Sequence, residues 1–189
     1  MQSADIVGKK IIIMQLNHLT AFNLHWSLLF MGHKLLGLIG HLNLKLKLGE
    51  MFSGARTEGA TVNGSPIRVR DNNDIADALV CTGYSYLISE REVHAKRVAD
   101  IVMKVRDLRR FGAAAVDLCF VACGRLDAYF EEHLHSWDLI AGQVIATEAG
   151  AVFSDYVGNP VTPAQVIAST PGVHAELIRL IAASGSGTS

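Results

Sequence analysis

The hydrophobic and polar positions of this 189-residue chain follow a regular pattern from residue 50 onward. Short apolar runs alternate there with longer segments of helical periodicity, and turn residues separate them. The runs predict strands over 50–55, 60–62, 65–69, 78–83, 105–108, 126–131, 152–153 and 166–169. The periodic segments predict helices over 89–104, 112–122, 138–149 and 171–183. This alternation of strands and helices is typical of an α/β or layered α+β arrangement.

Turn and cap residues set the expected limits of these elements. Asn63 and Gly64 form a two-residue hairpin signal between the strands at 60–62 and 65–69. We expect Ser89 to cap the first helix and Gly112 to open the second one. Pro171 is suited to the first position of the last helix, because its missing N–H costs nothing there.

Upstream of residue 48 the pattern is weaker and the composition changes. Between Asp5 and Glu50 there is no acidic residue, but there are five lysines and half of the eight histidines. Two strands are predicted, at 11–14 and in the strictly alternating run 42–48. We therefore predict a boundary here. A divergent apolar and basic segment would span 1–47, a second region 48–183, and a flexible Gly/Ser tail 184–189.

This upstream segment allows few functions of its own. His18, His25, His33 and His41 recur every seven or eight residues, so a zinc site is conceivable. Incidental histidines are the better interpretation, because no ligand pair stands at i,i+4 and no carboxylate is near. The apolar run 26–40 is interrupted by a histidine and a lysine. It falls short of the roughly 20 apolar residues that a membrane span needs. Binding to a membrane surface remains an alternative for this segment.

Charge and cysteine content narrow the class of protein. The net charge is −1, which argues against a nucleic-acid-binding protein. No signal peptide of the usual form opens the chain. Cys81, Cys119 and Cys123 cannot all pair with one another, and they stand among apolar residues. We expect buried, reduced thiols in a cytoplasmic protein.

The most informative motif is the run Ser-Trp-Asp-Leu-Ile-Ala-Gly over 136–142, followed by Thr-Glu-Ala-Gly over 147–150. Asp138 would lie near the N-cap of an Ala/Gly-rich helix, where free N–H groups and the helix dipole favour a carboxylate. A carboxylate at that place can also hold a hard cation at the mouth of a cleft.

With three further blocks, this motif resembles the C-terminal portion of the inositol monophosphatase family, most closely its bacterial branch. The blocks are the hairpin region 48–67, the Arg-Arg-Phe-Gly-Ala-Ala-Ala-Val-Asp-Leu run over 109–118, and the Gly-Arg-Leu-Asp-Ala-Tyr-Phe-Glu run over 124–131. The hairpin block alone is a weak signal, but the order and spacing of the blocks together are a strong one. The resemblance covers residues 48–181.

The resemblance implies a layered αβαβα fold that usually forms a homodimer. It implies Mg²⁺-dependent hydrolysis of a small phosphorylated polyol, typically inositol 1-phosphate. Asp138 matches a metal-ligating aspartate, and Glu131 matches a carboxylate that contacts inositol hydroxyl groups. Gly112, Ala113 and Ala114 match the backbone segment that lines the substrate pocket, and many members have Ser or Thr at the position of Ala113. His135 matches a histidine found in some members.

Two other family motifs are absent from this sequence. These are the Glu-Glu or Glu-Thr/Ser metal motif and the Asp-x-x-Asp-Gly-Thr/Ser loop, which should precede residue 48. Residues 6–49 contain no carboxylate that could replace them. We therefore expect very weak or absent catalysis. Three origins stay open: a degraded or truncated gene, a shifted reading frame upstream of residue 48, and a short paralogue with a non-catalytic interaction or regulatory role.

Overall fold

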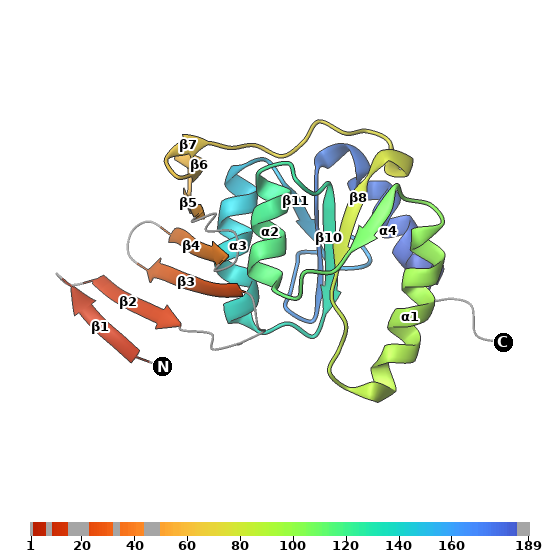
Figure 1. Ribbon diagram of the computed structural model, residues 1–189, viewed down its shortest axis with the longest axis horizontal. Helices are drawn as coiled ribbons and strands as arrows, with labels where there is room; N and C mark the ends of the chain where they lie inside the picture. Colours follow the sequence, from red (N-terminus) through yellow and green to blue (C-terminus); the bar gives the residue numbers. More distant parts are fainter. Residues whose placement is uncertain (1, 7–8, 15–22, 32–34, 44–49, 185–189) are drawn as a thin grey trace.

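The computed structural model describes residues 2–6, 9–14, 23–31, 35–43 and 50–184. In this part of the chain four layers follow one another: an antiparallel sheet, a pair of helices, a mixed sheet and a second pair of helices (Figure 1). The layered α/β fold expected from the sequence is confirmed. The described residues do not include the outer helical layer of a five-layer αβαβα arrangement.

The first sheet is an antiparallel meander in which each strand pairs with the next one along the chain. Its strands are β1 (Gln2–Ile6), β2 (Lys9–Met14), β3 (Asn23–Met31), β4 (Leu35–Asn43), β5 (Glu50–Ala55), β6 (Gly59–Val62) and β7 (Ser65–Pro66). The predicted hairpin between β6 and β7 is confirmed, with φ of 49° at Asn63 and 78° at Gly64. The return strand is shorter than expected, because the Val69 N–H donates to the Ala149 carbonyl of a helix end instead of pairing within the sheet.

The upstream strands continue this sheet. β4 pairs with β5 from Leu36 opposite Ala55 to His41 opposite Glu50, so the predicted boundary near residue 48 falls between two paired strands. The apolar run 26–40 contributes to β3 and β4 rather than to a helix. No helix in the described ranges is long and apolar enough to cross a membrane. Residues 44–48 of the predicted alternating strand lie outside the described residues, as do His18 and His33.

The second sheet has the order β11-β12-β10-β8-β9. Its strands are β8 (Leu79–Thr82), β9 (Asp107–Arg109), β10 (Ala128–Glu132), β11 (Val152–Ser154) and β12 (Gln165–Ser169). β10, β8 and β9 run parallel, whereas β11 and β12 pair antiparallel. The central strands β10 and β12 carry runs of buried apolar residues, at 128–130 and 166–168, as expected of strands that helices cover on both faces.

Two pairs of helices enclose the second sheet. The pair between the sheets is α2 (Ala114–Ala122) and α3 (Ser136–Glu148), and the outer pair is α1 (Ile88–Val102) and α4 (Pro171–Ser184) (Figure 1). Small residues in α3 allow the two helices between the sheets to approach each other closely. A Cβ added at Gly142 would lie 2.8 Å from the Cβ of Leu118, so glycine allows α2 and α3 to pack closely.

Some element limits differ from the prediction. Ser89 does not cap α1: the N-cap is Leu87, whose N–H is bonded by the hydroxyl of Ser85. α2 begins at Ala114 rather than at Gly112, which has a φ of 83° and forms the turn before the helix. Cys81 and Cys119 are buried and Cys123 partly so, and all three are free thiols as predicted.

His174 of α4 is buried between two serines of the second sheet. The Ser154 hydroxyl donates its single proton to the Asp155 carbonyl at 2.7 Å, so it can only accept from His174 Nε2, at 3.0 Å. In the neutral ring the single proton is then on Nε2, and Nδ1 accepts a hydrogen bond from the Ser169 hydroxyl at 2.7 Å. This pattern requires the neutral imidazole, and burial lowers the pKa of His174 below its usual range.

We expect the free energy of unfolding to fall as the pH drops below about 6.5, the ordinary histidine value. His174 is neutral in the folded protein and takes up a proton on unfolding, so the unfolded state binds more protons in this range and acid favours it. Urea denaturation between pH 7.5 and 5 would measure the slope. His174→Gln is the control for the other histidines, and an equal slope in both proteins would exclude His174 as the cause.

Candidate functional site

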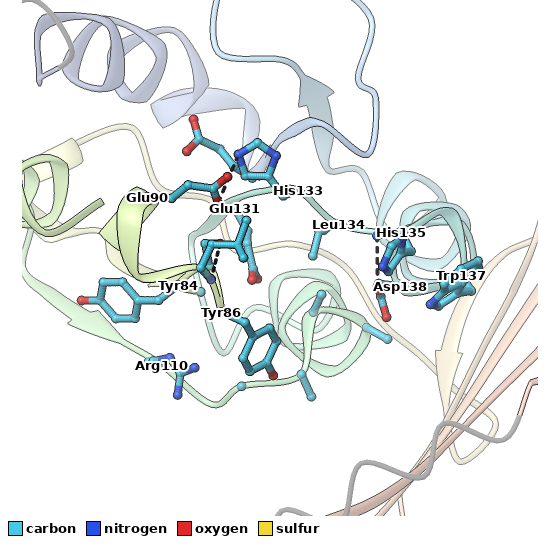
Figure 2. A pocket seen from close by; sticks show the side chains of 18 residues that line it. Tyr84, Tyr86, Glu90, Arg110, Glu131, His133, Leu134, His135, Trp137 and Asp138 are labelled. Atoms are coloured by element: carbon cyan, nitrogen blue, oxygen red, sulfur yellow. Dashed lines mark hydrogen bonds and ion pairs between the residues drawn. The ribbon is translucent and has the colours of Figure 1, made fainter. Parts of the chain in front are cut away.

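A cavity of about 560 Å³ opens where β8 and β10 end and where α2 and α3 begin (Figure 2). Ligands of α/β folds commonly bind at the carboxyl ends of parallel strands, because loops and helix N-termini converge there. The walls come from the loop 83–87, the segment 110–115, the end of β10 with the following loop, and the start of α3.

The structure brings all five predicted site residues to this cavity. Asp138 and Glu131 line it together with Gly112, Ala113 and Ala114. They come from three segments that are separate in the sequence: the end of β10, the turn before α2 and the first turn of α3. Their assembly is a property of the fold, and the roles that the resemblance implies for them stay predictions.

Glu131 is a half-buried carboxylate at the end of β10 with a fixed orientation. Its Oε2 accepts a hydrogen bond from the Tyr129 hydroxyl, whose ring is fully buried. Burial raises the pKa of Glu131, while the Tyr129 hydroxyl and the positive charge of Arg110 partly oppose this shift. Gly83 lies against the same carboxylate, and a Cβ added at Gly83 would occupy its position.

Asp138 has a structural partner in its own helix. It occupies the third position of α3, and its Oδ2 accepts the backbone N–H of the N-cap residue His135 at 3.0 Å. The His135 ring stacks on Trp137, with 4.4 Å between the ring centroids. The carboxylate therefore satisfies a free N–H at the helix start, as expected of an acidic residue in a first turn.

The donor set does not fit a magnesium ion. Mg²⁺ requires about six oxygen ligands in near-octahedral geometry. Within the described residues, no group of three or more His, Cys, Asp or Glu side chains is placed to hold a metal. Asp138 and Glu131 each have a hydrogen-bond donor already. Asp117 is buried, and burial raises its pKa to about 7, which disfavours the charged form that a cation needs.

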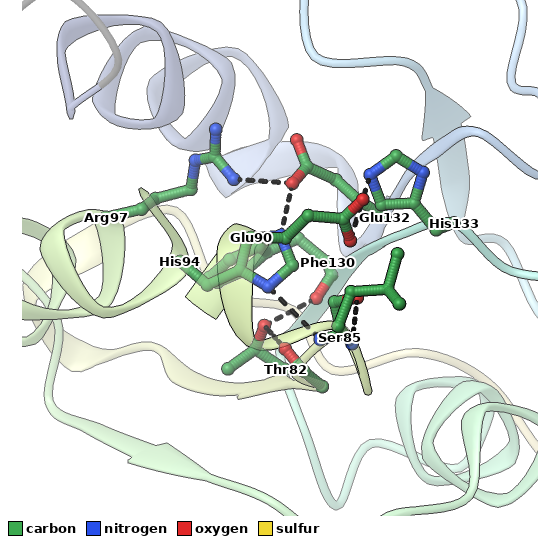
Figure 3. A network of polar contacts seen from close by, with 10 residues as sticks. Thr82, Ser85, Glu90, His94, Arg97, Phe130, Glu132 and His133 are labelled. Atoms are coloured by element: carbon green, nitrogen blue, oxygen red, sulfur yellow. Dashed lines mark hydrogen bonds and ion pairs between the residues drawn. The ribbon is translucent and has the colours of Figure 1, made fainter. Parts of the chain in front are cut away.

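A polar network missed by the sequence analysis fixes the wall of the cavity (Figure 3). Glu132 Oε2 forms an ion pair with Arg97 Nη1 at 3.0 Å and a hydrogen bond with His94 Nε2 at 2.5 Å. The Ser85 N–H donates to His94 Nδ1 at 3.3 Å, so the other ring nitrogen carries the proton. The network ties the loop 83–87 and α1 to the end of β10.

A signal for this network exists in the sequence. Glu90, His94 and Arg97 stand at i, i+4 and i+7 and so share one face of α1. Glu132 and His133 meet this face from the end of β10, and His133 Nε2 lies 3.7 Å from Glu90 Oε2. A polar stripe on a helix predicts a solvated face as readily as a buried network, so the sequence does not distinguish the two.

Comparison with known proteins identifies the family of the chain. A model of the inositol monophosphatase family matches residues 25–186. Nus factor SuhB of Vibrio cholerae is 37% identical over 132 residues, which is 68% of this chain and 49% of that protein. Inositol-1-monophosphatase of Synechocystis sp. is 35% identical over 137 residues, which is 71% of this chain and 48% of that protein. The chain spans about half the length of these relatives.

Solved structures show the same fold. Inositol monophosphatase from Anabaena superposes with a TM-score of 0.74 and 29% identity, over 84% of this chain and 64% of that one. SuhB of Mycobacterium tuberculosis gives a TM-score of 0.71 and 33% identity, over 85% of this chain and 64% of that one. The family match begins at residue 25, upstream of the region recognised in the sequence. From its sequence, fold and pocket, the chain belongs to the inositol monophosphatase family.

Proposed function

We propose that the cavity is the polyol-binding end of an inositol-monophosphatase-type site. Its ligand would be a small phosphorylated polyol such as inositol 1-phosphate. The observation that carries this proposal is the meeting of Glu131, Asp138 and the backbone of 112–114 in one cavity. An ionised or hydrogen-bonded carboxylate such as Glu131 can accept hydrogen bonds from two neighbouring hydroxyl groups of a polyol. The Tyr129 hydroxyl holds this carboxylate in place for that task.

We further propose that Mg²⁺-dependent hydrolysis, the reaction of the family, is very weak or absent in this chain. Phosphate-ester hydrolysis depends on cations that offset charge on the phosphoryl oxygens and on a water molecule positioned in line. Bound Mg²⁺ would supply that charge compensation. Four carboxylates line the cavity, but Glu132 and Glu90 are engaged by basic side chains, and no group of three within the described residues is placed to hold the ion. Residues 6–49 contain no carboxylate that could add to them.

A phosphate-release assay tests this proposal. With inositol 1-phosphate and Mg²⁺ in the millimolar range, we expect no turnover above a buffer control, because positioning supplies most of the acceleration in phosphoryl transfer. Mn²⁺ in place of Mg²⁺ and an Asp138→Asn variant serve as controls. Robust turnover that Asp138→Asn abolishes would contradict the proposal and would mean that a partner subunit or other groups complete the site.

A non-catalytic interaction or regulatory role is the second candidate function. It is favoured by the name Nus factor, which the relative from Vibrio cholerae carries. The tip of the loop before α1 also exposes apolar surface, with Tyr86, Leu87 and Ile88 exposed by 76%, 60% and 81%. Such surface suits a partner protein or a second copy of the chain. We place this role in the cytoplasm, in line with the free thiols.

A further inference from the structure

Arg110 is a cationic residue of the cavity wall. It lines the cavity, and within the described part of the chain it forms no ion pair with a carboxylate. Two nearby carboxylates are paired with other basic residues and not with Arg110. Glu132 is paired with Arg97 and His94, and Glu90 lies beside His133. Arg110 is thus a cationic group of the cavity that remains available to a ligand.

The Arg110 side chain is exposed, but it lines the cavity and is held against the cavity wall. Its guanidinium carbon lies 5.6 Å from the centroid of the Tyr84 ring, in cation–π geometry. Its Nη1 lies 3.8 Å from the position that a Cβ would take at Gly112, a residue of the cavity wall. Its charge also acts on the carboxyl groups of Glu131 and Asp117. These contacts orient the planar guanidinium before any ligand arrives.

The neighbouring residue Arg109 differs from Arg110 in its partners and in its position. Arg109 pairs with Asp107, and its Nη1 also donates to the Leu108 carbonyl at 2.9 Å. Arg109 does not line the cavity. Two consecutive arginines therefore differ in role. Arg109 is neutralised on the outside of β9, whereas Arg110 presents its donors to the cavity.

We propose that Arg110 forms a metal-independent anion subsite, which binds the phosphate group of a phosphorylated polyol while Glu131 accepts its hydroxyl groups. This inference rests on the proposed function. A guanidinium can donate two parallel hydrogen bonds to a phosphate, and it does so without a cation as bridge. Figure 2 draws Arg110 beside Tyr84 and Tyr86, and Asp138 on the opposite side of the cavity. The subsite therefore differs from the place where the family's aspartate stands.

Calorimetric titration of the full chain in EDTA tests this subsite, with inositol 1-phosphate, myo-inositol and inorganic phosphate as separate probes. We expect Arg110→Gln to weaken the binding of inositol 1-phosphate about tenfold or more, the loss expected of charge-assisted hydrogen bonds. Inorganic phosphate should weaken in parallel, whereas the affinity for myo-inositol should not change. Arg109→Gln is the matched control and should change no affinity more than about twofold. Both arginines are exposed, so neither variant endangers the fold.

Three results would overturn the inference, and they separate it from the proposed function. If Arg110→Gln binds inositol 1-phosphate as the wild type does, or if phosphate binding in EDTA is absent while myo-inositol binds, the subsite is wrong and the polyol cavity stands. If neither inositol 1-phosphate nor myo-inositol binds to the wild type, both proposals fail. Arg110→Lys adds a further check, since retained charge without the planar fork should restore only part of the affinity.

Discussion

Replacing Asp127 with alanine is expected to lower the free energy of unfolding by about 3–5 kcal/mol. The Asp127 carboxylate is 1% exposed and accepts hydrogen bonds from three donor groups. Its Oδ1 accepts from Asn72 Nδ2 at 3.0 Å, and its Oδ2 accepts from the Leu79 N–H at 2.8 Å and from Arg70 Nη1 at 3.2 Å. These bonds join β10 to β8 and to the segment that crosses from the first sheet.

The large loss of stability expected for Asp127→Ala comes from the buried donors that it leaves unpaired. The Leu79 N–H and the Asn72 amide would remain without their acceptor in the interior, which costs more than the lost bonds themselves. Denaturation in guanidinium chloride, followed by circular dichroism, measures the change. Asp107→Ala is the matched control, because the Asp107–Arg109 pair is about half exposed and solvent-exposed ion pairs contribute little to stability. Similar losses for the two variants would contradict the assignment of Asp127 as a buried anchor.

Gly83→Ala should reduce the affinity for a polyol ligand about 10- to 100-fold, a loss of about 1.4–2.8 kcal/mol in binding free energy. The added Cβ takes the position of the Glu131 carboxylate, and the flexible end of that side chain must leave its place beside Tyr129. Because only this side chain moves, we expect the stability of the protein to change much less than with Asp127→Ala.

A double-mutant cycle tests whether Gly83→Ala lowers the affinity through Glu131. Glu131→Ala should cause a loss similar to that of Gly83→Ala, and the combined variant should lose little more than either one, because both remove the same contact. Calorimetry with myo-inositol reports the three affinities. Additive losses would show that Gly83 acts on the ligand independently of Glu131.

Local signals predicted much of the fold downstream of residue 50. The Asn63–Gly64 turn needs only two residues with positive φ, so the sequence alone identifies it. The limits of the helices were less predictable, since neighbouring polar residues compete for one role. Ser89 has the expected chemistry for a cap, yet Ser85 bonds the Leu87 N–H and α1 begins at Ile88. Such choices depend on how the loop docks on β10, which is not a local property.

The domain boundary that composition suggests near residue 48 stays a prediction. The lack of acidic residues between Asp5 and Glu50 suggests a break, whereas the backbone register carries one sheet across it. Backbone pairing depends little on side-chain charge, and a family match from residue 25 agrees with this continuity.

The cavity was predictable only in part, and chiefly through resemblance. Glu131, Asp138 and the segment 112–114 follow from the family motifs. Arg110 and Gly83 do not, because their roles depend on a ring and a carboxylate that the fold brings to them from other segments.

Equilibrium dialysis with inositol 1-phosphate in the presence of Mg²⁺ tests the central claim most directly, when the ligand retained with the protein is identified by ³¹P NMR. The account predicts that the full chain retains the intact phosphate monoester and that no inorganic phosphate accumulates beyond a protein-free control. Accumulation of inorganic phosphate with no monoester retained would contradict it, and the chain would then be a working phosphatase.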